Sequence, residues 1–145
     1  MLVEGLIVVM DLDRFEEFIE EKGLSQWSPN IVTGTLTLLV EEFARKWQAI
    51  VVYGLDPKRG TEEVVLEIPF GHEFVDEITR DLSRIKEEIN KLGASISIVV
   101  VKDFVLAKTA NNRREAYYGS PGRKRAIRFL KKIKRRGGNR LEIIL

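Results

Sequence analysis

The stretch "IVVMDLDRFEEF", residues 7–18, decides how the rest of this chain is interpreted. An apolar run, Leu6–Met10, is typical of a buried β-strand, and it ends in two aspartates one residue apart, Asp11 and Asp13. Because side chains alternate along a strand, these carboxylates share one face, and their repulsion is costly unless a positive charge lies between them. Two interpretations fit: a bound divalent cation, or a solvated strand end at which Asp13 caps the next helix.

The composition indicates one soluble globular domain covering residues 1–145. Apolar residues make up 44% and charged residues 32% of the chain, which is enough to build a core under a charged surface. The chain has no Cys and a single His, which excludes disulfides, thiolate metal sites and multi-His sites. The N-terminal apolar run is too short for a membrane span or signal peptide, so we expect a cytoplasmic protein without membrane association. Abundant Glu, Lys and Arg without Cys is typical of thermophile proteins.

Positive charge is concentrated at the C-terminal end. Residues 113–145 contain twelve Lys and Arg but two Glu, a balance of +10, whereas the preceding residues have a balance of −8. Such a segment indicates a phosphate-bearing ligand or nucleic acid, or else a solvated helix face that pairs with acidic parts of the same chain. The candidates for nucleic-acid binding lie in "RKRAIRFLKKIKRR", residues 123–136, and are Arg123, Lys124, Arg125, Arg128, Lys131, Lys132, Arg135 and Arg136.

Hydrophobic periodicity and turn residues predict an α+β fold. We predict strands at residues 2–10, 49–54, 61–69, 94–106 and 140–145, helices at 14–22, 31–48, 74–92 and 123–136, and an irregular segment at 107–122. The centre of this order is the split β-α-β unit of ferredoxin-like folds. We therefore expect an antiparallel sheet with helices on one face, followed by a basic C-terminal helix and a strand.

In this topology the first strand lies beside the hairpin of residues 49–69. Asp11 and Asp13 then lie near Glu62 and Glu63, and one of the two glutamates shares their face. Carboxylate oxygens suit Mg²⁺ or Mn²⁺, which bind substrate phosphates and activate an attacking water or hydroxyl. The alternative is a set of ordinary helix-cap and edge-strand acids.

Three segments, in the same order and register, resemble the GGDEF-type nucleotidyl cyclase domains, which have a palm-like fold. They are "VVMDLDRFEEFIEEKG" (8–23), "GTEEVVLEIP" (60–69) and "AIRFLKKIKRRGGNRLEII" (126–144). A fourth segment, "NIVTGTLTLLVEE" (30–42), is similar to part of the archaeal type-III GTP cyclohydrolases, although an ordinary capped helix start explains it equally. The resemblance implies a purine nucleoside triphosphate such as GTP as ligand, Mg²⁺ or Mn²⁺ as cofactor, and a homodimer.

The resemblance also implies roles for individual residues. The implied metal-binding set is Asp11, the carbonyl of Leu12, Asp13, Glu62 and Glu63. The implied phosphate-binding and nucleotide-binding set is Phe15, Gly60, Thr61, Lys134 and Arg140.

Several positions depart from the cyclase pattern. Thr61 replaces a motif glycine, Ile19 replaces the guanine-binding asparagine, Glu16 replaces a lysine, and Gly138 replaces an arginine of the closing motif. We therefore do not expect diguanylate cyclase activity. Three functions stay open. The first is metal-dependent binding of a nucleotide, with or without cyclohydrolase-like or cyclase-like turnover. The second is a non-catalytic module that binds nucleic acid through the basic helix, and the third is a structural or oligomer-forming protein that pairs through its helices.

Overall fold

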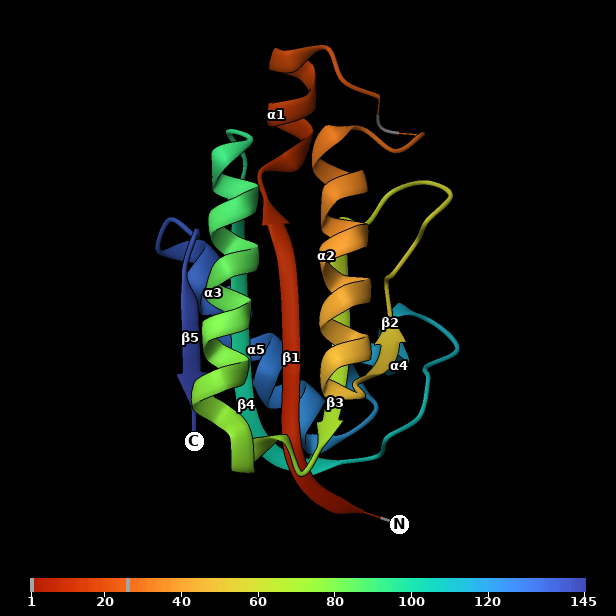
Figure 1. Cartoon of the computed structure of the whole chain (residues 1–145), viewed down its shortest axis with the longest axis vertical. Helices are drawn as coiled ribbons and strands as arrows, with labels where there is room; N and C mark the ends of the chain where they lie inside the picture. Colours follow the sequence, from red (N-terminus) through yellow and green to blue (C-terminus); the bar gives the residue numbers. More distant parts are fainter. Residues whose placement is uncertain (1, 26) are drawn as a thin grey trace.

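A five-stranded sheet forms the middle layer of the structure, a computed structural model that describes residues 2–25 and 27–145 (Figure 1). The strands are β1 (Val3–Asp13), β2 (Ile50–Tyr53), β3 (Glu63–Pro69), β4 (Ser95–Val105) and β5 (Leu141–Ile144), in the order β2-β3-β1-β4-β5. The α+β class is confirmed, with β1 at the centre between β3 and β4.

The antiparallel prediction holds for the first four strands and is wrong for the fifth. β1 pairs antiparallel with β3 and β4, and β2 with β3, whereas β5 runs parallel to β4. The reason is the connection between β4 and β5. It includes a helix that crosses the sheet, and such a crossover returns the chain in the same direction. The sheet is therefore mixed.

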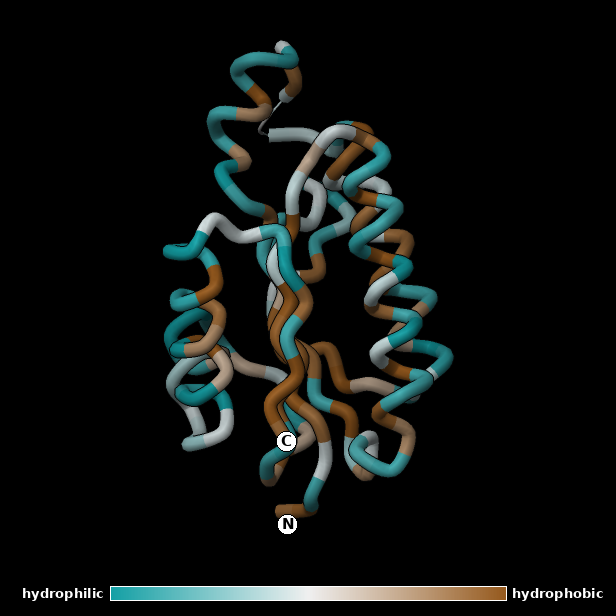
Figure 2. Tube along the Cα trace, turned by 90° about the vertical axis from the view of Figure 1, so that its left-hand side faces the viewer, coloured by the Kyte–Doolittle hydropathy of each residue, from teal (hydrophilic) through white to brown (hydrophobic). Residues whose placement is uncertain are grey.

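Helices cover both faces of the sheet. They are α1 (Phe15–Lys22), α2 (Ile31–Trp47), η1 (Gly71–Phe74), α3 (Val75–Lys91), α4 (Arg113–Tyr118) and α5 (Pro121–Arg135). α2 and α3 pack on one face, as predicted, and α5 with α4 packs on the other (Figures 1 and 2). The short helix α4 lies in the segment predicted to be irregular, and the side chain of Asn112 caps it by accepting a hydrogen bond from the Glu115 backbone N–H.

The alternation of β1 explains the two cores. Leu6, Val8 and Met10 belong to the cluster under α2 and α3, while Ile7 and Val9 belong to the cluster under α5. A strand buried on both faces is a continuous apolar run, which is what the sequence shows. Within the described residues, no helix is both long and apolar enough to cross a membrane.

A buried ion pair connects the strands to the α5 layer. Arg123 of α5 is 1% exposed, Glu67 of β3 is fully buried, and Arg123 Nε lies 3.0 Å from Glu67 Oε2. The other oxygen of Glu67 accepts from the backbone N–H groups of Leu106 and Ala107. Arg123 also donates to backbone carbonyls, at Glu115 in α4 and at Lys108. Because every charged atom finds a partner, the pair is tolerated inside the protein.

We expect Arg123→Met to lower the free energy of unfolding by about 3–5 kcal/mol, because it leaves the Glu67 carboxylate buried without its cation. The double variant Arg123→Met/Glu67→Gln is expected to lose less than the sum of the two single variants. Urea denaturation measures all three. Arg125→Met is the control, since Arg125 pairs with Asp103 at a half-exposed position. An equal loss in Arg125→Met would contradict the special role of the buried pair.

Candidate metal and phosphate site

The positive charge between Asp11 and Asp13 is a lysine ammonium. Lys134 Nζ, from α5, lies 3.3 Å from Asp11 Oδ2 and 3.0 Å from Asp13 Oδ1. It also donates a hydrogen bond of 3.1 Å to the carbonyl oxygen of Leu12. The interpretation in which Asp13 caps the following helix is wrong, because α1 begins after Arg14 without a side-chain cap.

Asp13 is fully engaged in holding the chain together. Its two oxygens accept from the Ser97 hydroxyl at 2.8 Å and from the Asn139 backbone N–H at 2.7 Å, in addition to Lys134. The turn before Asn139 lies so close that a Cβ on Gly138 would be 2.7 Å from the Asp13 carboxylate. Gly138, which stands where the closing motif has an arginine, is therefore required by packing on Asp13.

Asp11 lies in a different environment. Its side chain is 25% exposed, and the register of β1 on β3 places Glu63 directly opposite. Burial raises the pKa of Asp11 to about 6, and the negative charges of Glu63 and Asp13 add to this rise while Lys134 opposes it. Lys134 therefore offsets only part of what burial and the neighbouring carboxylates cost the ionised form of Asp11.

Glu63 has its own cation, Arg113 at the start of α4. Arg113 Nε lies 2.7 Å and Nη2 3.3 Å from the two carboxylate oxygens of Glu63, in a bidentate pair. The hydrogen bonds and charge of Glu63 hold the pKa of the Arg113 guanidinium above its usual range. The neighbouring Glu62 points elsewhere and pairs with Arg59 at 3.2 Å.

Tyr117 brings an unsatisfied hydroxyl to the same place. Its side chain is 3% exposed, and its hydroxyl has no hydrogen-bond partner among the described residues. Burial, together with the charges of Glu63 and Asp11, raises the pKa of Tyr117, and the Arg113 guanidinium lies over its ring at 5.0 Å. A buried donor next to two carboxylates is a position that a bound ligand or water would satisfy.

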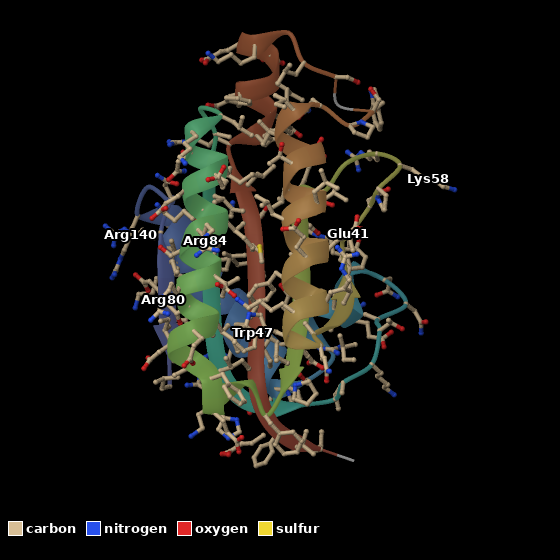
Figure 3. All side chains as sticks on the ribbon, in the orientation of Figure 1. Glu41, Trp47, Lys58, Arg80, Arg84 and Arg140 are labelled. Atoms are coloured by element: carbon tan, nitrogen blue, oxygen red, sulfur yellow. The ribbon has the colours of Figure 1, made fainter. Side chains whose placement is uncertain are left out.

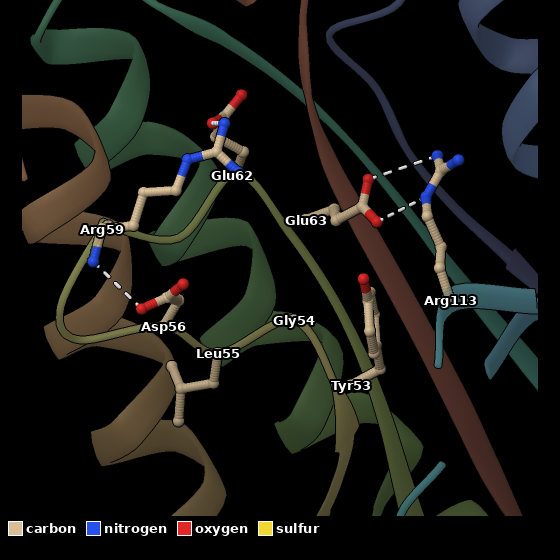
Figure 4. Close-up of a pocket in the computed structure, with 9 residues that line it drawn as sticks. Tyr53, Gly54, Leu55, Asp56, Arg59, Glu62, Glu63 and Arg113 are labelled. Carbon is tan, nitrogen blue, oxygen red and sulfur yellow. Dashed lines mark hydrogen bonds and ion pairs between the residues drawn. The ribbon is translucent and has the colours of Figure 1, made fainter. Parts of the chain in front are cut away.

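An open pocket of about 510 Å³ adjoins this cluster (Figure 4). It is lined by Tyr53, Gly54, Leu55, Asp56, Arg59, Gly60, Glu62, Glu63 and Arg113. Figure 4 shows Arg113 directed at Glu63 and Arg59 folded over Glu62. The pocket therefore contains both signs of charge, and each acid in these two pairs faces an arginine.

The turn before β3 is held in place by contacts with the N-terminal part of α2. Gly60 has a φ of +101°, and a Cβ there would lie 2.2 Å from the Thr33 hydroxyl. Thr61 is fully buried, and its hydroxyl lies 2.7 Å from that of Thr37. The Thr61 side chain thus points into the protein and does not obstruct the pocket. Within residues 30–42, Thr33 and Thr37 have this packing role.

The remaining predicted residues lie away from the cluster or face another way. Phe15 is buried in the core and stacks on Phe18. Arg140 is exposed at the side of the molecule, 3.9 Å from Glu142 (Figure 3). Of the basic candidates, Arg123 is buried against Glu67 and Arg125 pairs with Asp103, as described above.

Sequence reasoning did not include Arg113 and Ser97 in the site. A signal for Arg113 exists in "NRRE", residues 112–115, where Asn followed three residues later by Glu is a helix-start pattern. No local pattern marks Ser97, which is an inward-facing residue of an apolar strand.

Within residues 2–25 and 27–145, no three Asp, Glu, His or Cys side chains form a group ready to hold a metal ion. Comparison with known proteins does not extend this picture. No protein-family model matches the chain, and the curated proteins contain no significant match to it.

We expect Asp11→Asn to raise the free energy of unfolding at pH 7.5 by about 1–3 kcal/mol. The pKa of Asp11 in the folded protein, about 6, lies above its ordinary value of 3.8. The folded state therefore holds more protons than the unfolded state between these values, and stability falls as the pH rises through this window. Urea denaturation at pH 4, 5, 6 and 7.5 measures the effect.

Asp13→Asn is the matched comparison. It removes charge-assisted hydrogen bonds and is expected to cost about 2 kcal/mol. If both variants lose stability at pH 7.5, the difference between the two carboxylates is contradicted.

Proposed function

We propose that this chain binds a purine nucleoside triphosphate, such as GTP, as its complex with Mg²⁺ or Mn²⁺. The observation that carries the proposal is the environment of Asp11, a partly buried carboxylate directly opposite Glu63, with a pKa raised to about 6. A divalent cation would supply the positive charge that Lys134 alone does not. The purine and the triphosphate rest on the resemblance of the sequence motifs.

The number of acids supports a shared metal site better than a protein cage. Mg²⁺ is usually held by one or two carboxylates together with waters and substrate phosphates. Asp11 and Glu63 supply two carboxylates, and the Leu12 carbonyl that now accepts from Lys134 supplies a third oxygen.

The cations already present suit the phosphates. Lys134 and Arg113 now neutralise Asp11, Asp13 and Glu63. A metal ion at Asp11 and Glu63 would make part of this neutralisation unnecessary, and the two side chains would then be available to phosphate oxygens. The metal ion would thus replace Lys134 and Arg113 as the positive charge beside the carboxylates, while these two side chains bind the triphosphate.

The pocket beside Glu63 is the place for the nucleoside. Its volume of about 510 Å³ lies within the range of roughly 300–1,000 Å³ for small-molecule sites. Its acids include Asp56 and Glu62, and carboxylates accept hydrogen bonds from the ring N–H and amino group of guanine.

Calorimetric titration of GTP and ATP, with Mg²⁺ and again with a chelator, tests the proposal. We expect binding that requires the metal and that weakens at least tenfold in Asp11→Asn. Phosphate release in the same samples reports turnover. Glu77→Gln is the control, because it removes the same charge from an exposed position on α3. Binding that survives the chelator or Asp11→Asn, or no binding at all, would overturn the proposal.

We expect Arg113→Gln to have opposite effects on metal and nucleotide. Without nucleotide, Mn²⁺ binds more tightly, because Glu63 no longer has a competing cation. With nucleotide, the affinity falls about tenfold or more, because a charge-assisted hydrogen bond to phosphate is lost.

Electron spin resonance of free Mn²⁺ measures the first effect, and calorimetry the second. The exposed neighbour Arg114→Gln is the control and should change neither. If the affinities for Mn²⁺ and for the nucleotide change in the same direction in Arg113→Gln, then Arg113 does not move from Glu63 to a phosphate when the metal binds.

A further inference from the structure

The nine basic residues of positions 123–136 divide into two groups. Three are used inside the protein: Arg123 pairs with Glu67, Arg125 with Asp103, and Lys134 with Asp11 and Asp13. The other six are exposed, and none of them forms an ion pair with an acid of the described residues. We call these six the outer stripe: Lys124, Arg128, Lys131, Lys132, Arg135 and Arg136.

The outer stripe is continuous along α5. Its members recur at intervals of three and four residues, which places them on one side of the helix. From residue 124 to residue 136 it extends about 18 Å at 1.5 Å per residue. The opposite side of α5, with Ala126, Ile127, Leu130 and Ile133, is buried on the sheet. No acid occurs between Glu115 and Glu142, so nothing in this segment interrupts the positive charge.

An aromatic ring stands beside the stripe. Tyr118, the last residue of α4, is 45% exposed, and Lys131 Nζ donates a 3.0 Å hydrogen bond to its hydroxyl. This contact and the charge of Lys131 lower the pKa of Tyr118. Next to the ring lies an open hollow of about 650 Å³, whose wall includes Arg114 and Lys124. Lys131 thus holds the ring beside the stripe, and the hollow next to it is lined by Arg114, Lys124 and the acid Glu115.

We propose that the outer stripe binds single-stranded nucleic acid, with backbone phosphates along α5 and a base stacked on Tyr118. A row of unpaired cations with an exposed aromatic ring is the combination that such strands require, since phosphates supply the affinity and the ring binds the face of any base. A lipid surface fits less well, because the apolar side of α5 is buried on the sheet and cannot enter a bilayer. The proposal does not depend on a nucleotide at Asp11.

The test uses the whole chain and a fluorescent single-stranded oligo-U of about 15 nucleotides, with chelator present. Anisotropy is measured between 50 and 200 mM salt. Six phosphate contacts predict that affinity falls about 300-fold over this range, and three contacts predict about 20-fold. The stripe variant carries Arg128→Gln, Lys132→Gln and Arg135→Gln.

The control variant removes the same charge from exposed residues outside the stripe. It carries Lys22→Gln, Lys58→Gln and Arg80→Gln. Lys58 and Arg80 are labelled in Figure 3. We expect the control variant to keep the roughly 300-fold fall in affinity over this salt range, whereas the affinity of the stripe variant, with three cations left, falls only about 20-fold. Tyr118→Phe should bind normally and Tyr118→Ala about tenfold more weakly, because stacking requires the ring but not the hydroxyl.

The proposal is overturned if the unchanged protein does not bind at 50 mM salt, or if both charge variants weaken binding equally. Tighter binding to a duplex of the same length, or to anionic vesicles, would overturn the assignment to a single strand. Asp11→Asn is expected to bind the oligonucleotide normally. Failure of this proposal can therefore be distinguished from failure of the proposed nucleotide site.

Discussion

The buried pair between Arg123 and Glu67 is the constraint on which the α5 side of the molecule depends. It joins β3, which contains Glu67, to α5. Through hydrogen bonds to the backbone it also fixes α4 and the segment after β4. α4 carries Arg113 to Glu63, and α5 carries Lys134 to Asp11. The charges at the end of the sheet are therefore positioned by another charge pair, deeper in the protein, whose geometry leaves little freedom.

Residues 113–145 are strongly basic and the preceding residues are acidic, and this difference has two separate explanations. Lys134 and Arg113 meet acids of β1 and β3, so part of the basic segment pairs with the same chain. The six residues of the outer stripe do not, and they make up half of the twelve Lys and Arg of residues 113–145. On α5, the basic residues that pair with acids of the same chain and the six exposed cations thus form two separate groups.

The sequence predicts the strands well because a buried strand is recognisable from its pattern of apolar residues. The neighbourhood of Asp11 and the hairpin acids follows from the strand order, and Glu63 does face Asp11. The parallel pairing of β5 and the short helix α4 leave weaker traces. The partner of Asp11 and Asp13 could not be found from local patterns, because which lysine of a basic helix points inward depends on how the whole helix packs. The resemblance to the cyclases marked Lys134 for another reason, its place in a phosphate-binding motif.

The contacts of Asp13 have a consequence for how the chain acquires its structure. Its partners Lys134 and Asn139 are 121 and 126 residues away, so the first strand is completed only by the last part of the chain. During synthesis, Asp11 and Asp13 cannot contact their cation until the chain has been made at least as far as Lys134. Contacts of such long range are made slowly, because loop closure must precede them. The contacts that hold the Asp13 end of β1 are therefore expected to form late in folding.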